Sequence, residues 1–181
     1  MEKLYDFNID CERLYQEWCK IDQNLDIKNN TYSRMLINTI NNKEKYYVVD
    51  NGEAFSGDTI ENPDWYSVKK ILTKFKKSYT EEVCLLVEDW LKTINFSATR
   101  IKYAALYPGS WIGAHADFTG YRFHIPIITN DKCDFIVDNI NYKLDSLGSI
   151  YKFNSDLIHS IANNGNSIRL HLMFDVRNLN G

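Results

Sequence analysis

The chain has 181 residues, of which 44% are hydrophobic and 25% charged, and its formal net charge is −3. These are the values of one ordinary globular domain, and they argue against a disordered chain and against a strongly basic nucleic-acid binder. No apolar stretch approaches the roughly 20 residues that cross a bilayer. From the net charge and this absence we expect neither nucleic acid nor a membrane among the partners.

The N-terminus and the cysteines indicate where the protein works. Residues 1–6 (MEKLYD) lack the cationic start and the apolar block of a secretory signal. The four cysteines include no C-x-x-C pair, which favours reduced thiols over a disulfide framework or a cysteine-based zinc site. We therefore expect a cytoplasmic protein.

Helical patterns dominate residues 1–95, which we expect to form a mainly helical supporting segment of one domain, residues 1–181. A first helix should cover residues 11–21, and Asn62-Pro63-Asp64 should open a second with an N-cap, a first-turn proline and a first-turn acid. Ser78 and Glu81 form a capping box that should begin a third helix. The expected apolar stripe of this third helix is Val83, Leu86, Val87, Trp90, Leu91 and Ile94.

Residues 96–181 change character and predict short strands. Five extended segments are separated by turn-forming pairs such as Pro-Gly, Thr-Gly and Leu-Gly. They cover residues 99–107, 121–129, 134–137, 149–153 and 168–176. Several short strands at close spacing are typical of a sandwich, a barrel or a jelly roll, so we expect an α+β protein with a mainly β core.

Two of these segments collect polar side chains on one face. In the second segment Arg122 and His124 alternate with apolar residues, and in the last segment Arg169, His171 and Asp175 do the same. A sheet with one wet face would explain such an alternation by itself.

The four histidines of the chain add a second signal, because all of them lie within residues 115–171. Random placement would put all four in one given stretch of this length in roughly one chain in a hundred. A group of His, Arg and Asp side chains on the inner face of a small barrel indicates a site for a metal and for anions.

The spacing of the ligand types is that of a metal site. His115-Ala116-Asp117 places two of them two residues apart, on one side of an extended chain, and His159 is followed ten residues later by Arg169. Two imidazoles and one carboxylate leave coordination positions open on a metal, which suits non-haem Fe(II) chemistry. The open positions can hold a 2-oxo acid and O₂, and an arginine deeper in the barrel would anchor the far carboxylate of 2-oxoglutarate.

With these residues in place, the chain resembles the aspartyl/asparaginyl β-hydroxylase family of Fe(II)/2-oxoglutarate dioxygenases over residues 98–178. The resemblance depends on the order and spacing of several short motifs. They are Leu106-Tyr107-Pro108-Gly109, Ile112, His115-Ala116-Asp117, Arg122-Phe123-His124-Ile125-Pro126-Ile127, Thr129-Asn130, Leu147-Gly148, Asn154, His159-Ser160, Asn163, Arg169-Leu170-His171-Leu172 and Asp175. The implied fold is a double-stranded β-helix, a cupin-like jelly roll, with its outer apolar face covered by the N-terminal helices.

The resemblance also implies a role for each site residue. The Fe(II) ligands, and with them the catalytic centre, would be His115, Asp117 and His159. Arg169 would pair with the distal carboxylate of the cosubstrate 2-oxoglutarate, and His124 would lie beside its metal-binding end. Arg122 would contact either the cosubstrate or a substrate carboxylate. Trp111 could line the pocket or simply pack, and the role of His171 stays open.

The chain departs from the protein-hydroxylating members of that family. They have a glycine in place of Asp117 and a serine in place of Ala104, so this chain looks more like the bacterial members that hydroxylate free amino acids. We expect hydroxylation of an unactivated C–H bond in a small molecule or peptide that carries a carboxylate, such as an amino acid or an Asp/Asn-type residue. Two alternatives stay open: a cupin-type metalloenzyme that does not use 2-oxoglutarate, and a non-catalytic jelly-roll binding module. The sequence leaves the oligomeric state open.

Overall fold

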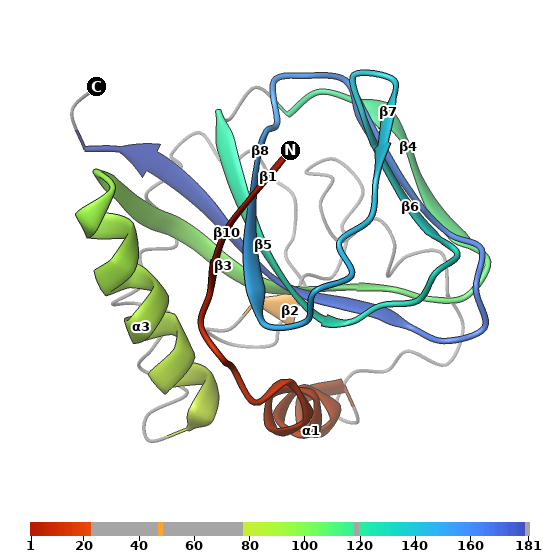
Figure 1. Cartoon of the computed structure of the whole chain (residues 1–181). Helices are drawn as coiled ribbons and strands as arrows, with labels where there is room; N and C mark the ends of the chain where they lie inside the picture. Colours follow the sequence, from red (N-terminus) through yellow and green to blue (C-terminus); the bar gives the residue numbers. More distant parts are fainter. Residues whose placement is uncertain (23–46, 49–77, 118–119, 180–181) are drawn as a thin grey trace.

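The computed structural model describes residues 1–22, 47–48, 78–117 and 120–179 (Figure 1). The described helices are α1 (Cys11–Asp22) and α3 (Tyr79–Thr93). The described strands are β1 (Glu2–Asp6), β2 (Tyr47–Val48), β3 (Phe96–Leu106), β4 (Ser110–His115), β5 (Tyr121–Ile128), β6 (Cys133–Val137), β7 (Ile140–Tyr142), β8 (Ser149–Asn154), β9 (His159–Asn163) and β10 (Arg169–Asn178). The helix predicted to open at Asn62-Pro63-Asp64 lies outside the described residues.

The strands form two antiparallel sheets. One sheet has the order β1-β8-β5-β10-β3-β2, and the other has the order β4-β9-β6-β7. From β3 to β10 each strand crosses to the opposite sheet, except at the β6–β7 hairpin, so the second half of the path mirrors the first. This path is that of a double-stranded β-helix, which confirms the predicted mainly β jelly roll.

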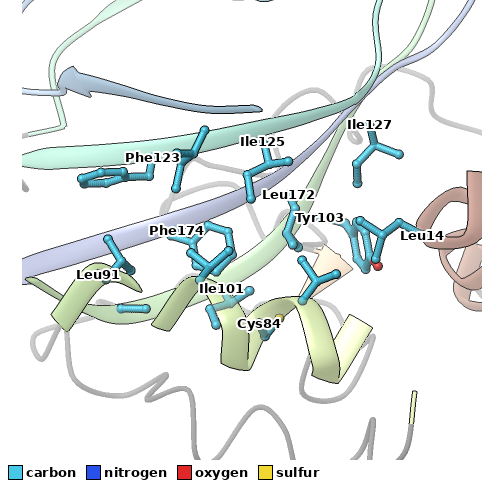
Figure 2. Packing of buried hydrophobic residues seen from close by; sticks show 14 of the residues in the cluster. Leu14, Cys84, Leu91, Ile101, Tyr103, Phe123, Ile125, Ile127, Leu172 and Phe174 are labelled. Atoms are coloured by element: carbon cyan, nitrogen blue, oxygen red, sulfur yellow. The ribbon is translucent and has the colours of Figure 1, made fainter. Parts of the chain in front are cut away.

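The outer face of the larger sheet is covered by both helices (Figure 1), with α3 against β3 and α1 against β5. The core between these layers is made of alternate residues of β3, β5 and β10 together with helix residues (Figure 2). Its labelled members are Leu14, Cys84, Leu91, Ile101, Tyr103, Phe123, Ile125, Ile127, Leu172 and Phe174. Full burial of each large apolar side chain stabilises the fold by about 1.5–3 kcal/mol, so this core holds the larger sheet in place.

The N-terminus of α3 is capped within the helix and is also contacted by α1. Ser78 Oγ accepts a hydrogen bond from the Glu81 amide at 3.1 Å, which confirms the predicted N-cap of α3. Glu17 of α1 accepts hydrogen bonds from the backbone amides of Tyr79 and Thr80, at 2.9 and 2.8 Å. A carboxylate at this position complements the positive N-terminal end of the α3 dipole, so α1 fixes where α3 begins.

One residue of the predicted apolar stripe on α3 is placed wrongly. Leu86 is 47% exposed, whereas Val83, Cys84, Val87 and Leu91 are buried. Leu86 follows Cys84 by two residues, about 200° around the helix, so the two side chains point to opposite sides. Cys84, which we did not include in the apolar stripe, is therefore buried in the core, and Leu86, which we did include, is exposed.

The polar face predicted for β5 and β10 lines the interior of the barrel, and its side chains are almost completely shielded from solvent. An apolar cluster from both sheets occupies part of it, including Phe135, Phe153 and Ile161. The rest is lined by the polar residues that alternate along β5 and β10. These are Arg122, His124, Arg169, His171 and Asp175, all of them buried. The alternation was therefore predicted correctly, but both faces of these strands are buried.

The described cysteines, Cys11, Cys19, Cys84 and Cys133, form no disulfide. Burial raises the pKa of the Cys11 thiol to about 11, with the carboxylates of Asp10 and Asp6 adding to the effect, so this thiol stays protonated at neutral pH. Neither described helix combines the length and apolar character that spanning a membrane requires. The cytoplasmic location and the organisation of residues 1–181 as one domain stay predictions.

Candidate metal centre

The three predicted metal ligands meet at one end of the smaller sheet. His115 is the last residue of β4, His159 is the first residue of β9, and the two are cross-strand partners. Between the pairs Ile112–Ile161 and His115–His159, β4 has one residue more than β9, which is a β-bulge. In a regular strand, a residue three positions after Ile112 would face the opposite side, away from the interior. The bulge therefore brings both imidazoles to the same side.

The ligand atoms of His115, Asp117 and His159 lie within 4.8 Å of one another. Asp117 Oδ1 is 3.6 Å from His115 Nε2, and Asp117 Oδ2 is 3.4 Å from His159 Nε2. A metal with bonds of about 2.1 Å holds adjacent ligand atoms about 3 Å apart, so small side-chain rotations would bring this set onto one ion. His159 is buried, and the other two are partly buried.

Both histidines are oriented by backbone carbonyl groups. His115 Nδ1 lies 2.7 Å from the carbonyl oxygen of Gly113, and His159 Nδ1 lies 2.9 Å from that of Leu157. A carbonyl can only accept, so Nδ1 carries a proton in each ring, and in the neutral tautomer with this proton the lone pair is on Nε2. Ligand histidines are commonly fixed in this way, which leaves both Nε2 atoms directed at Asp117 and ready to coordinate.

Asp117 is held as a carboxylate by an arginine between two acids. Burial alone would raise its pKa, but the positive charge of the Arg122 guanidinium outweighs burial and holds the pKa of Asp117 well below the ordinary carboxyl range. Arg122 Nη1 donates to Asp117 Oδ2, and Arg122 Nε donates to Asp175 Oδ1 at 2.5 Å. We call Asp117, Arg122 and Asp175 the carboxylate clamp, because the arginine fixes the ligand carboxylate and is itself fixed by Asp175.

Arg169 is in a different electrostatic situation deeper in the barrel. It is 4% exposed, and no carboxylate among the described residues forms an ion pair with it. Its Nη2 lies 3.1 Å from His171 Nδ1, and its Cζ lies 5.6 Å from the centre of the Phe135 ring. Burial lowers the pKa of Arg169 to about 10, which still leaves it charged at neutral pH. A buried charge without a counterion is costly, so this position favours an anionic ligand.

Aromatic rings connect the metal ligands with Arg169. Phe153 lies 5.1 Å from the ring of His159 and 5.4 Å from that of His124, measured between ring centres. Phe135 contacts both of these histidines and also lies under the guanidinium of Arg169. The surface between the two polar sites is therefore apolar, and it suits the methylene groups of a short dicarboxylic acid.

The structure thus brings together the predicted ligands and places the other predicted residues around them. His124 is buried, with its Nδ1 3.3 Å from that of His171. Trp111 is 55% exposed and does not pack in the core. Our sequence-based assignment gave no role to Asp175, although it shares the inner face of the last strand, and none to Phe135, although its strand was predicted.

The donor set fits the implied metal. Two neutral imidazole nitrogens and one carboxylate oxygen, all on one side, form the facial set typical of non-haem Fe(II) sites. A comparison with known protein families agrees with this chemistry. Residues 36–178 match the family described as "Aspartyl/Asparaginyl beta-hydroxylase". The chain belongs to this family.

Three solved structures similar to the chain share little sequence with it. A 2OG-Fe(II) oxygenase family oxidoreductase from Burkholderia pseudomallei is 14% identical, with a TM-score of 0.44 over 55% of this chain and 57% of that chain. A cupin domain from Bordetella pertussis is also 14% identical, with a TM-score of 0.37 over 43% of this chain and 80% of that one. A predicted oxalate decarboxylase from Thermotoga maritima is 22% identical, with a TM-score of 0.37 over 45% and 68% of the two chains. No curated protein matches the chain significantly.

Proposed function

We propose that this family member is an Fe(II)- and 2-oxoglutarate-dependent dioxygenase that hydroxylates an unactivated C–H bond. The observation that carries the proposal is the buried guanidinium of Arg169, which has no carboxylate partner among the described residues and shares the barrel interior with the ligand set. A dicarboxylic 2-oxo acid satisfies both sites at once. One end chelates a metal, and the other end neutralises the buried cation.

Each residue of the site has a definite task in this proposal. His115, Asp117 and His159 hold the metal through Nε2, a carboxylate oxygen and Nε2. Arg122 keeps Asp117 ionised and oriented. Phe135 lies against the guanidinium of Arg169 and packs on Phe153, so this part of the interior is apolar, which strengthens the attraction between the charge of Arg169 and a carboxylate. His124 lies against the same rings, beside the proposed cosubstrate site.

Bound Fe(II) would supply the chemistry that no side chain has, namely the O₂-dependent oxidation of a C–H bond coupled to decarboxylation of 2-oxoglutarate to succinate and CO₂. The protein's own contribution is to bind, to orient and to keep the interior dry.

For the substrate we propose a carboxylate-bearing amino acid or an Asp/Asn-type residue, and the support is family membership. Arg122, which we expected to contact the cosubstrate or this carboxylate, already pairs with two acids, so its role in substrate binding stays a prediction.

Succinate formation tests the proposal directly. Purified protein with Fe(II), ascorbate and 2-oxoglutarate should release succinate and consume O₂, and free amino acids or Asp/Asn peptides that are substrates should increase both rates. Asp117→Ala and Arg169→Met should abolish turnover, whereas the matched surface variant Asp134→Asn should not. Absence of 2-oxoglutarate turnover with metal binding verified would contradict the proposal. Metal-dependent oxidation without any 2-oxo acid would instead favour the cupin-type alternative.

A further inference from the structure

His171 is a buried imidazole near the start of β10, and the proposed function gives it no task. His171 is 0% exposed, and its Nε2 has no hydrogen-bond partner among the described residues. Buried polar atoms are nearly always hydrogen-bonded, so one without a partner calls for a ligand or an ordered water.

The contact with Arg169 fixes which nitrogen of His171 carries the proton. Arg169 Nη2 lies 3.1 Å from His171 Nδ1, and a guanidinium can only donate. Nδ1 must therefore present its lone pair, and the proton of the neutral ring is on Nε2. Burial, together with the charge of Arg169 and the neighbouring His124, lowers the pKa of His171 well below its usual range, which agrees with a neutral ring. His171 thus offers a buried N–H donor.

The strands on either side of His171 supply nothing for this donor. Its cross-strand partners are Ala104 on β3 and Pro126 on β5, whose side chains have no polar atoms. The two nitrogens of an imidazole lie on opposite sides of the ring. Because Nδ1 faces the guanidinium of Arg169, the Nε2–H group points away from it.

We propose that His171 serves both ends of the cosubstrate. Through Nδ1 it positions the guanidinium of Arg169 for the distal carboxylate, and through Nε2–H it donates to an oxygen of the 2-oxo acid end. His171 is thus a positioning residue for Arg169 and a binding residue for the cosubstrate. The proposal rests on the proposed function, because it takes 2-oxoglutarate as the ligand of this barrel.

Two substitutions separate the two contacts. His171→Asn places an amide near the position of Nδ1, so its oxygen can still accept from Arg169 while the Nε2–H donor is lost. His171→Gln reaches the position of Nε2 and retains a donor there. The matched third variant, Arg169→Met, removes the cation and leaves the histidine. Thermal melts of the Zn(II)-loaded variants verify that each is folded.

Calorimetric titration of the Zn(II)-loaded protein uses three probes: 2-oxoglutarate, pyruvate and succinate. Pyruvate has the 2-oxo acid end alone, and succinate lacks it. We expect His171→Asn to weaken both 2-oxo acids about 10-fold or more and succinate much less, because the lost hydrogen bond is to a charged group. We expect Arg169→Met to weaken 2-oxoglutarate and succinate but not pyruvate, and His171→Gln to bind pyruvate more tightly than His171→Asn.

A nitrogen NMR measurement tests the premise without relying on variants. Long-range proton–nitrogen correlation in the wild-type protein at neutral pH should show His171 as the neutral Nε2–H tautomer, and its N–H proton should shift when 2-oxoglutarate binds to the Zn(II) form. A Nδ1–H tautomer, or unchanged binding of the 2-oxo acids by His171→Asn, would overturn the proposal. Wild-type protein that holds Zn(II) but binds no 2-oxo acid would overturn the proposed function as well, so the two failures are distinguishable.

Discussion

Replacement of Asp175 by asparagine tests whether the carboxylate clamp controls the metal centre from outside the ligand set. Asp175 is not a ligand, but it accepts a hydrogen bond from Arg122 Nε at 2.5 Å while the same guanidinium donates to Asp117. Asparagine keeps an oxygen for that hydrogen bond and removes the negative charge. The whole charge of Arg122 then acts on Asp117 and competes with a divalent cation.

The expected size of the effect follows from the burial of the clamp. The side chains of Arg122 and Asp175 are each 4% exposed. Two unit charges 4 Å apart attract by about 4 kcal/mol at an effective dielectric constant of 20, before the cost of desolvation is subtracted. Loss of the charge assistance should lower the free energy of unfolding of the metal-free protein by about 1–2 kcal/mol. Loss of an outer partner of a metal ligand should weaken Mn(II) binding about 10–100-fold.

Urea unfolding and calorimetric titration with Mn(II) measure the two quantities. Asp134→Asn is the matched control, because Asp134 pairs with Lys143 at 2.8 Å where the two side chains are 31% and 44% exposed. Such a surface pair contributes less than about 1 kcal/mol, and the control should bind Mn(II) as the wild type does. If Asp175→Asn also bound Mn(II) with wild-type affinity, the clamp would be a structural ion pair without influence on the ligand carboxylate.

Three further predictions concern single contacts. Arg169→Met should raise the midpoint of thermal unfolding, because a buried charge without a described carboxylate partner is replaced by an apolar side chain. The affinity for 2-oxoglutarate, measured by calorimetry, should fall about 100-fold or more. A lower midpoint would mean that the charge is balanced within the protein. The second prediction concerns pH. The pKa of His171 is lowered in the folded state, so below about pH 6.5 only the unfolded chain takes up a proton at this residue. The free energy of unfolding of the wild type should therefore fall by about 1.4 kcal/mol per pH unit relative to that of His171→Phe, and equal pH slopes in urea titrations would contradict this. Ser78→Ala should cost about 0.5–2 kcal/mol in the same urea assay, because the amide of Glu81 loses its cap, and Ser78→Thr should retain most of the stability.

The sequence predicted those parts of the site that depend on local pattern. The alternation along β10 placed Arg169 and Asp175 on one face, because side chains in any strand alternate with a period of two. The direction of His115 could not be predicted in the same way. It depends on the bulge opposite β9, and that bulge is a property of how β4 pairs with a strand more than 40 residues further along the chain. Strands β1, β2, β4, β7 and β9 were likewise missed, because none of them shows in the sequence the alternation of apolar and polar residues that identifies β5 and β10.

The two inner arginines show most clearly where sequence reasoning ends. Arg122-Phe123-His124 and Arg169-Leu170-His171 have the same R-x-H pattern on neighbouring strands, and both arginines are buried. Arg122 has its charge balanced within the protein by two carboxylates, one of them 53 residues away in the sequence. Arg169 has an imidazole and an aromatic ring beside it and no carboxylate among the described residues, and we propose that its counterion is a ligand. Anion selectivity in this barrel should therefore respond to changes around Arg169, whereas changes around Arg122 should act first on the metal.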